Sequence, residues 1–236
     1  MPSLVLLHLS QRSACSYLFR DDRLVARSEV AQRCYTPEPG RCEHAAVESW
    51  ARAHKAIRAL RELGQVRRGE IAAIGLVTLS GVVAWSRAGD RPLCPAPVGP
   101  DARRAAWLLT HAPAVRAAAE KDDLMLGPID AWLIWNLTGR FATAPDNAAA
   151  TGLLDPRSQA WDAAHCAALG LPLTALPEIT RDSAAWGSTC EEGPFNAVAP
   201  ILAVRAESPN APAWDDILAC RDALTLALAS GDQGKP

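Results

Sequence analysis

The chain has 236 residues, of which 49% are hydrophobic and 21% charged, and its net charge at pH 7 is −2. This length allows a substantial core in one large domain or two small ones. A near-neutral charge excludes the basic surface typical of nucleic-acid and anionic-membrane binders. The sequence shows no apolar run of about 18 residues and no basic-then-apolar leader, so it predicts a cytoplasmic protein with no nucleic-acid or membrane partner.

The cysteines and histidines form no familiar ligand pattern. No Cys-x-x-Cys pair and no His-x-x-x-His spacing occurs, and the number of cysteines is odd. This pattern favours reduced thiols and indicates neither a structural nor a catalytic zinc site, so no metal is expected. The cysteines are Cys15, Cys34, Cys42, Cys94, Cys166, Cys190 and Cys220.

The first third of the chain predicts a strand, a hairpin and a long helix. Residues 3–9 are apolar throughout, as in a strand buried on both faces. A polar turn at residues 20–23 separates two short strands, and residues 35–40 form a loop punctuated by prolines. A helix is expected over residues 45–63. Its predicted core face consists of Val47, Trp50, Ile57, Leu60 and Leu63.

Two further strands are predicted at residues 71–77 and 81–85, followed by a helix over 101–120 that Pro113 kinks or splits. The order strand, hairpin, helix, strand is typical of an α/β fold, with a mixed sheet and flanking helices.

The second half predicts three helices and one strand. A helix over residues 127–139 ends at Gly139, and a loop with one short strand at its end follows over 141–155. Residues 161–169 form a short helix and residues 198–204 the last strand. An amphipathic helix is expected over 214–229, and the tail 230–236 is expected to be disordered.

A resemblance to a known family rests on the stretch that begins Gly127-Pro-Ile-Asp-Ala-Trp-Leu-Ile-Trp-Asn-Leu-Thr-Gly139 and continues through Asn147-Ala148, Trp161-Asp162 and Gly170-Leu-Pro. It resembles the N-terminal domain of the FGGY carbohydrate kinases, of the glycerol kinase type. The resemblance implies a ribonuclease H-like, actin-like ATPase domain over residues 1–208, shortened near residues 104–107. A helix outside the family pattern follows over 209–229. The tryptophans of this stretch are expected to pack in the core.

In that family the opening strand ends in Asp-x-Gly-Thr-Thr-Ser, which holds a magnesium-linked carboxylate and cradles phosphate on backbone amides. The matching residues are His8, Ser10, Gln11, Arg12 and Ser13. Imidazole is a poor ligand for magnesium, and Ser10 lacks the conformational freedom of glycine. Arg12 still attracts an anion, so the loop predicts weak phosphate contact at most.

The family's polyol-binding motif Asn-Gln-Arg-Glu is matched by a stretch that contains Thr78, Ser80 and Gly81, without the arginine and glutamate that grip two hydroxyls. Asp101 and Arg103 resemble a second cleft motif, Trp-x-Asp-x-Arg. Asp101 is explained equally well as a helix N-cap.

Glu207 stands where the family has the aspartate that accepts the proton of the substrate hydroxyl. The extra methylene displaces the carboxylate by about 1 Å, enough to lower a rate by orders of magnitude. A solvated carboxylate after a strand is the simpler interpretation. The family's second, ATP-binding lobe has no counterpart in this sequence.

These observations lead to three hypotheses. The first is a degenerate, single-lobe kinase relative without phosphotransferase activity and without a cofactor, which binds a protein partner, a second copy of itself, or weakly a polyol or phosphate. The second is an ATP- and magnesium-dependent polyol kinase whose other lobe belongs to another chain. The third is a folded remnant without a function.

Overall fold

The computed structural model describes residues 3–39, 41–89, 91–99, 102–208 and 212–230. The expected disordered tail over 230–236 lies outside these residues, apart from Ser230. No helix in the described ranges is both long enough and apolar enough to cross a bilayer.

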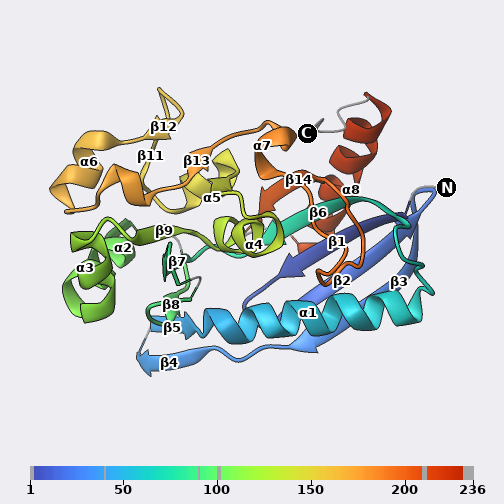
Figure 1. The fold of residues 1–236 in the computed structure, drawn as a ribbon, viewed down its shortest axis with the longest axis horizontal. Helices are drawn as coiled ribbons and strands as arrows, with labels where there is room; N and C mark the ends of the chain where they lie inside the picture. The colour runs from blue at the N-terminus through green and yellow to red at the C-terminus, as the bar shows by residue number, and fades with distance from the viewer. Residues whose placement is uncertain (1–2, 40, 90, 100–101, 209–211, 231–236) are drawn as a thin grey trace.

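A five-stranded mixed sheet forms the centre of the fold, in the order β14-β6-β1-β2-β3 (Figure 1). β1 (Ser3–Leu9) runs parallel to β6 (Ile71–Thr78), which runs parallel to β14 (Ile201–Ala206). β2 (Ser13–Arg20) and β3 (Arg23–Ala31) continue from β1 as an antiparallel meander. The mixed sheet and the predicted hairpin are therefore confirmed.

Helices cover both faces of this sheet, which explains why β1 is apolar along its whole length. Side chains alternate between the two faces of a strand. Val5 and Leu7 lie in the core under α1 (Ala46–Leu63), whereas Leu6 lies on the opposite face under α8 (Ala213–Ala229). Figure 1 shows α1 lying along one face of the sheet and α8 packing behind β14 and β6.

The close approach of α8 to β6 depends on Gly75. A Cβ atom at this position would lie 2.7 Å from Cys220 Sγ, closer than real contacts, and 3.1 Å from Leu224 Cδ1, which is tighter than most. We expect Gly75→Val to lower the free energy of unfolding by about 1–3 kcal/mol, because overpacking displaces α8. Urea denaturation measures this, with Ala72→Val on the same strand as the control. Equal costs for the two variants would contradict this packing.

A second hydrophobic cluster lies beyond the central sheet, around the two-stranded pair of β7 (Val82–Ser86) and β9 (Leu124–Pro128). The predicted strand at residues 81–85 therefore exists but lies outside the central sheet. Three helices surround this cluster: α2 (Ala102–His111), α3 (Pro113–Glu120) and α6 (Ala163–Ala168). Pro113 is the first residue of α3, so the predicted helix is split there, as expected for a residue without a backbone N–H.

The helix α4 (Ile129–Thr138) follows β9 and packs in the core of the central sheet, whereas β7 and β9 contribute side chains to both clusters. It ends at Gly139, whose φ of 72° closes the helix in the left-handed conformation. Trp132 on α4 packs edge-on against Trp85 of β7, with ring centroids 5.3 Å apart. Both side chains are buried, which agrees with the expectation for Trp132.

The remaining elements are short. They are β4 (Tyr35–Glu38), β5 (Arg41–His44), β8 (Ala96–Pro97), β10 (Ala142–Thr143), α5 (Pro145–Ala150), β11 (Leu154–Asp155), β12 (Ala160–Trp161), a 3-10 turn (Leu173–Ala175), β13 (Glu178–Ile179) and α7 (Ser183–Trp186). In three places the structure has an element that the sequence did not suggest. The loop expected at residues 35–40 contains β4, the loop at 141–155 contains α5, and the strand β9 was not expected.

The predicted core face of α1 is partly wrong. Val47 and Leu63 are 60% and 65% exposed. The helix instead buries smaller residues, among them Ala53 and Ala56, beside Ile57 and Leu60. Small side chains let the helix axis lie close to the sheet, and counting only large apolar residues misplaces its buried face. The last strand is also shifted, since Val198 is 65% exposed and β14 begins at Ile201.

Candidate functional site

The structure brings together two of the predicted site residues that are farthest apart in sequence. His8 Nε2 lies 3.2 Å from Glu207 Oε1. The His8 side chain is 4% exposed and that of Glu207 25% exposed. Glu207 is therefore not the freely solvated carboxylate of the simpler interpretation, but a partly buried group paired with an imidazole.

The parallel strands explain why His8 and Glu207 are in contact. The carboxyl ends of parallel strands lie at one edge of a sheet, and β1, β6 and β14 all end there. The backbone N–H of Glu207 donates to the carbonyl of Thr78 at 2.7 Å, and the N–H of Leu79 donates to the carbonyl of Leu9 at 2.9 Å. These bonds hold the ends of the three strands in register, and therefore hold Glu207 next to His8.

Asp216, in the first turn of α8, fixes the segment after β14. Its carboxylate accepts hydrogen bonds from the backbone N–H and the hydroxyl of Ser208, both at 2.8 Å. Asp216 is only 4% exposed. The sequence analysis assigned it no role, although an acidic residue on the buried side of a predicted amphipathic helix is a signal that could have identified it.

The turn between β1 and β2 carries the other residues that resemble the phosphate loop. Ser10 Oγ accepts from the backbone N–H of Ser13 at 3.1 Å, and the N–H of Ser10 donates to the carbonyl of Ser13 at 3.0 Å. The turn is thus closed by its own hydrogen bonds. Gln11 and Arg12 are exposed at its tip.

Thr78 is fully buried and makes a hydrogen bond that the sequence did not suggest. Its hydroxyl donates to Asn147 Oδ1 at 2.9 Å, across 69 residues of sequence. Nearby, the carbonyl of Ser80 accepts from the N–H of Gly99 at 2.8 Å, and a Cβ on Gly81 would lie 3.0 Å from the carbonyl oxygen of Pro97. This stretch therefore makes structural contacts to neighbouring backbone.

The remaining two residues of the predicted cleft are Arg103 and Asp101. Arg103 is exposed on α2. Asp101 lies outside the described residues, so neither its role as an N-cap nor its role in a cleft is tested.

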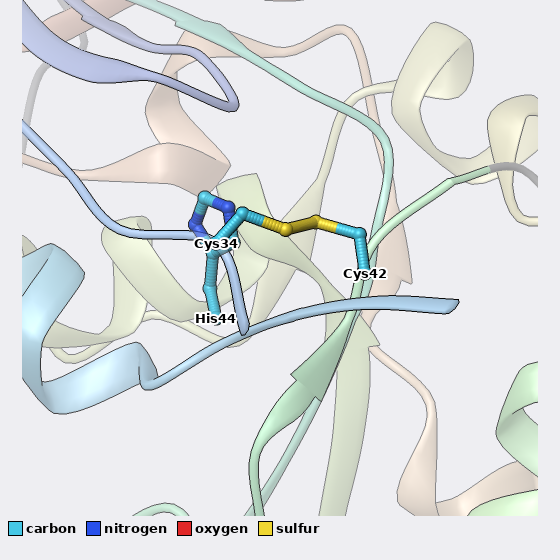
Figure 2. Close-up of side chains that lie close together, drawn as sticks. All are labelled: Cys34, Cys42 and His44. Atoms are coloured by element: carbon cyan, nitrogen blue, oxygen red, sulfur yellow. A yellow bond between two sulfur atoms is a disulfide. The ribbon is translucent and has the colours of Figure 1, made fainter. Parts of the chain in front are cut away.

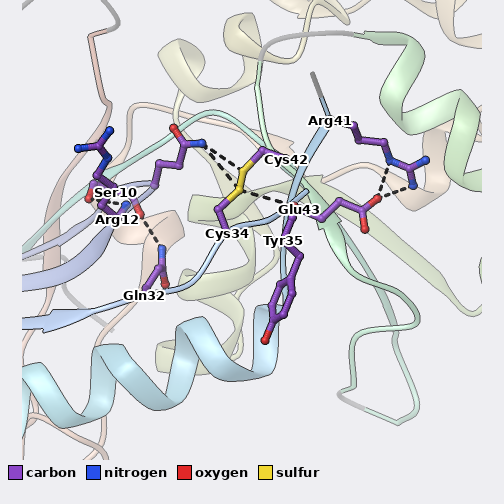
Figure 3. Close-up of a disulfide and its surroundings, with 9 residues drawn as sticks. Ser10, Arg12, Gln32, Cys34, Tyr35, Arg41, Cys42 and Glu43 are labelled. Carbon is purple, nitrogen blue, oxygen red and sulfur yellow. Dashed lines mark hydrogen bonds and ion pairs between the residues drawn. A yellow bond between two sulfur atoms is a disulfide. The ribbon is translucent and has the colours of Figure 1, made fainter. Parts of the chain in front are cut away.

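Cys34 and Cys42 form a disulfide between the segment before β4 and β5 (Figure 3). The expectation that all cysteines are reduced is wrong for this pair. The side-chain amide of Gln11 donates to Cys42 Sγ at 3.2 Å, which connects the disulfide to the tip of the β1–β2 turn. A pair eight residues apart has no sequence signature, and antiparallel pairing of β4 with β5 brings it together.

Asp130 of α4 is a fully buried carboxylate. It accepts hydrogen bonds from Thr143 Oγ1 at 2.8 Å and from the N–H of Ala144 at 3.0 Å. Burial raises the pKa of Asp130 from 3.8 to about 7, although the hydrogen bonds from Ala144 and Thr143 act in the opposite direction. Between these two pKa values the folded protein binds more protons than the unfolded chain, so this group lowers stability as the pH rises through that window.

Asp130→Asn should therefore flatten the pH dependence of stability between about pH 4 and pH 7, because the amide does not titrate. The slope removed is at most about 1.4 kcal/mol per pH unit. Urea denaturation at several pH values measures it, with the exposed Asp146→Asn of α5 as the control. If the slope of Asp130→Asn equals that of the wild type, the raised pKa is wrong.

The chain is similar to known carbohydrate kinases in both sequence and structure. Residues 102–201 match the FGGY family of carbohydrate kinases, N-terminal domain. A glycerol kinase of Halorhodospira halophila is 31% identical over 222 residues, which cover 79% of this chain and 43% of that protein. This chain is a relative of the FGGY carbohydrate kinases. The resemblance inferred from the sequence is confirmed.

Solved structures agree with this FGGY relative in fold. Glycerol kinase of Plasmodium falciparum, determined with ADP, superposes with a TM-score of 0.80 at 20% identity and covers 88% of this chain. Xylulose kinase of Rhodospirillum rubrum gives a TM-score of 0.77 at 17% identity over 87% of the chain. The predicted actin-like α/β fold is confirmed. The FGGY relative spans about half of each of these two structures, 49% in both cases.

Proposed function

We propose that this FGGY relative has no phosphotransferase activity on its own and acts in the cytoplasm by binding, either to a protein partner or to a small polyol or phosphate. The contact between His8 and Glu207 carries the proposal. In a kinase of this family, the carboxylate after the last strand must be free to accept the proton of a substrate hydroxyl. Here one of its oxygens is held by an imidazole.

The residues at this edge do not fit a magnesium nucleotide. Magnesium prefers oxygen ligands in an octahedron, and His8 offers a nitrogen in the position of the family's carboxylate. The hydroxyl of Ser10 is used in closing its own turn. Among these residues Arg12 supplies a positive charge, which supports weak contact with a phosphate but cannot orient a triphosphate. We therefore derive no catalytic step through ATP or magnesium.

The counterpart of the polyol cleft also lacks strong hydroxyl ligands. The Thr78 hydroxyl already donates a hydrogen bond to Asn147, and neither Ser80 nor Gly81 carries a charged group. An arginine or carboxylate would form the stronger, charge-assisted hydrogen bonds. Binding of a polyol here is therefore expected to be weak.

The proposal concerns the 236-residue chain by itself. Kinases that transfer a phosphoryl group obtain most of their rate from positioning and electrostatics around the γ-phosphate. Positioning of that kind requires a site closed from both sides. The described residues provide one side of such a site.

A second candidate function is a polyol kinase that is completed by an ATP-binding lobe on another chain. One observation favours it, because Glu207 is a carboxylate at the end of β14 and remains 25% exposed. A lobe that displaced His8 would free this group to act as a base.

Two measurements test the proposal. Thermal unfolding in the presence of ligands tests the absence of a kinase site, and light scattering together with the same unfolding data tests the binding role. Magnesium and ATP added to saturating glycerol should not raise the melting temperature above its value with glycerol alone, whereas a ligand at 100 times its Kd stabilises by about 2.7 kcal/mol. A rise that Glu207→Gln abolishes and the exposed control Glu178→Gln retains would favour the kinase. A stable dimer, or stabilisation by a polyol or phosphate alone, supports the binding half. A monomer that none of these ligands stabilises contradicts it.

A further inference from the structure

Three side chains with soft donor atoms gather beside the β1–β2 turn, outside the site described above. They are Cys34, Cys42 and His44, and one donor atom of each lies within 4.8 Å of the others. Figure 2 shows the imidazole next to the two sulfur atoms. Thiolate and imidazole are the donors that structural and catalytic zinc sites use.

The hairpin of β4 and β5 creates this cluster. Cys42 and His44 are two residues apart on β5, so both side chains project from the same face of the strand. Tyr35 pairs with Glu43, which places Cys34, the residue before Tyr35, opposite His44. The three donors therefore come from one antiparallel hairpin and the residue that precedes it. A local strand register produces this grouping without a Cys-x-x-Cys motif.

His44 provides a second, independent indication of a ligand. Its side chain is 2% exposed, and neither ring nitrogen makes a hydrogen bond of ordinary geometry to any residue that the structure describes; the backbone of Gln11 lies near the ring but in poor geometry. Buried polar atoms almost always have a partner, because an unpaired one loses its hydration without compensation. A metal ion bound to one ring nitrogen would satisfy that atom.

We propose that the reduced form of this chain binds one Zn²⁺ ion through Cys34 Sγ, Cys42 Sγ and one ring nitrogen of His44. A dithiol reductant supplies two electrons and two protons, which cleave the disulfide into two thiols while the reductant forms its own disulfide. Zn²⁺ then displaces the two thiol protons, and two Zn–S bonds and one Zn–N bond form. Water occupies the fourth position. A disulfide oxidant reverses the step: it accepts two electrons from the two thiolates and, with two protons, becomes two thiols, while the Cys34–Cys42 bond re-forms and the ion is released.

The geometry suits such a site. Tetrahedral zinc with Zn–S bonds of about 2.3 Å and Zn–N bonds of about 2.0 Å holds its donor atoms about 3.5–3.8 Å apart. The present donors already lie within 4.8 Å of one another, so opening the disulfide is the main movement required. Gln11 Nε2, 3.2 Å from Cys42 Sγ and 3.8 Å from Cys34 Sγ, would donate to the thiolates and help to orient them.

Metal titration of the whole chain in both redox states tests this proposal. The protein is reduced with dithiothreitol, desalted without oxygen, and titrated with Co²⁺ as a spectroscopic probe and with Zn²⁺ against a chromophoric chelator. We expect one ion per reduced chain, with the d–d absorption of tetrahedral cobalt and a thiolate-to-cobalt charge-transfer band. The oxidised protein should bind none at this site. This comparison requires no variant and so does not depend on the folding of a mutant.

Single-residue variants identify the ligands. Cys42→Ser and His44→Asn should each weaken Zn²⁺ binding by at least about 100-fold, because loss of a direct ligand exceeds the 10- to 100-fold loss typical of outer-shell changes. Cys190→Ser is the matched control, since Cys190 is an exposed free thiol elsewhere on the chain. Circular dichroism confirms that each variant is folded. The proposal is overturned if the reduced wild type binds no ion, if the oxidised protein binds equally well, or if the two ligand variants behave like the control.

Discussion

Replacing Trp85 by alanine is expected to lower the free energy of unfolding by about 3–5 kcal/mol, a large share of the total stability of a typical domain. Trp85 is fully buried. Its ring packs edge-on against Trp132 at 5.3 Å and against Phe141 at 5.5 Å between ring centroids. The cavity would separate α4, which packs in the first cluster, from β7, which contributes side chains to both hydrophobic clusters.

Urea denaturation measures this effect, and Trp214→Ala is the control. Trp214 is 42% exposed at the start of α8, so its replacement should cost less than about 1 kcal/mol. Trp85→Phe provides an intermediate case, because phenylalanine keeps most of the packing and removes an indole N–H that has no partner among the described residues. Equal losses for Trp85→Ala and Trp214→Ala would show that Trp85 does not hold β7 against α4.

Reduction of the disulfide between Cys34 and Cys42 is expected to lower the free energy of unfolding by about 2–3 kcal/mol, because the unfolded chain regains the entropy of an eight-residue loop. Thermal unfolding with and without a reductant measures the loss. A chelator must be present, so that metal bound to the free thiols does not replace the lost crosslink.

The double variant Cys34→Ser with Cys42→Ser is the control for this prediction. Its stability should match that of the reduced wild type, and adding the reductant should leave it unchanged. A wild type that melts at the same temperature in both redox states would contradict the predicted contribution of the disulfide.

Much of the fold could be predicted because the pattern of apolar residues is simple. The all-apolar stretch of β1 indicated a strand covered on both faces, and α1 and α8 provide that cover. The errors arose where tertiary contacts decide the structure. β4 contains Pro37 and is exposed, so only its pairing with β5 marks it as a strand. α1 buries alanines rather than Val47 and Leu63, because it lies close to the sheet.

The candidate site was predictable in part. The resemblance suggested that His8 and Glu207 belong to one site, and the structure places their side chains in contact. The resemblance could not indicate that Asp216 holds Ser208, or that Asn147 accepts from Thr78, because both bonds depend on the folded chain. The cluster of Cys34, Cys42 and His44 likewise depends on the register of one hairpin.

The most direct test of the central claim is glycerol-dependent release of ADP by the purified chain in the presence of ATP and magnesium. The imidazole of His8 contacts the Glu207 carboxylate, and our proposal holds that it replaces a magnesium-linked carboxylate. We therefore expect no ADP above the protein-free background, and no difference between the wild type and Glu207→Gln. Turnover at the rate of about 1–100 per second that is typical of kinases, abolished by Glu207→Gln, would contradict the account.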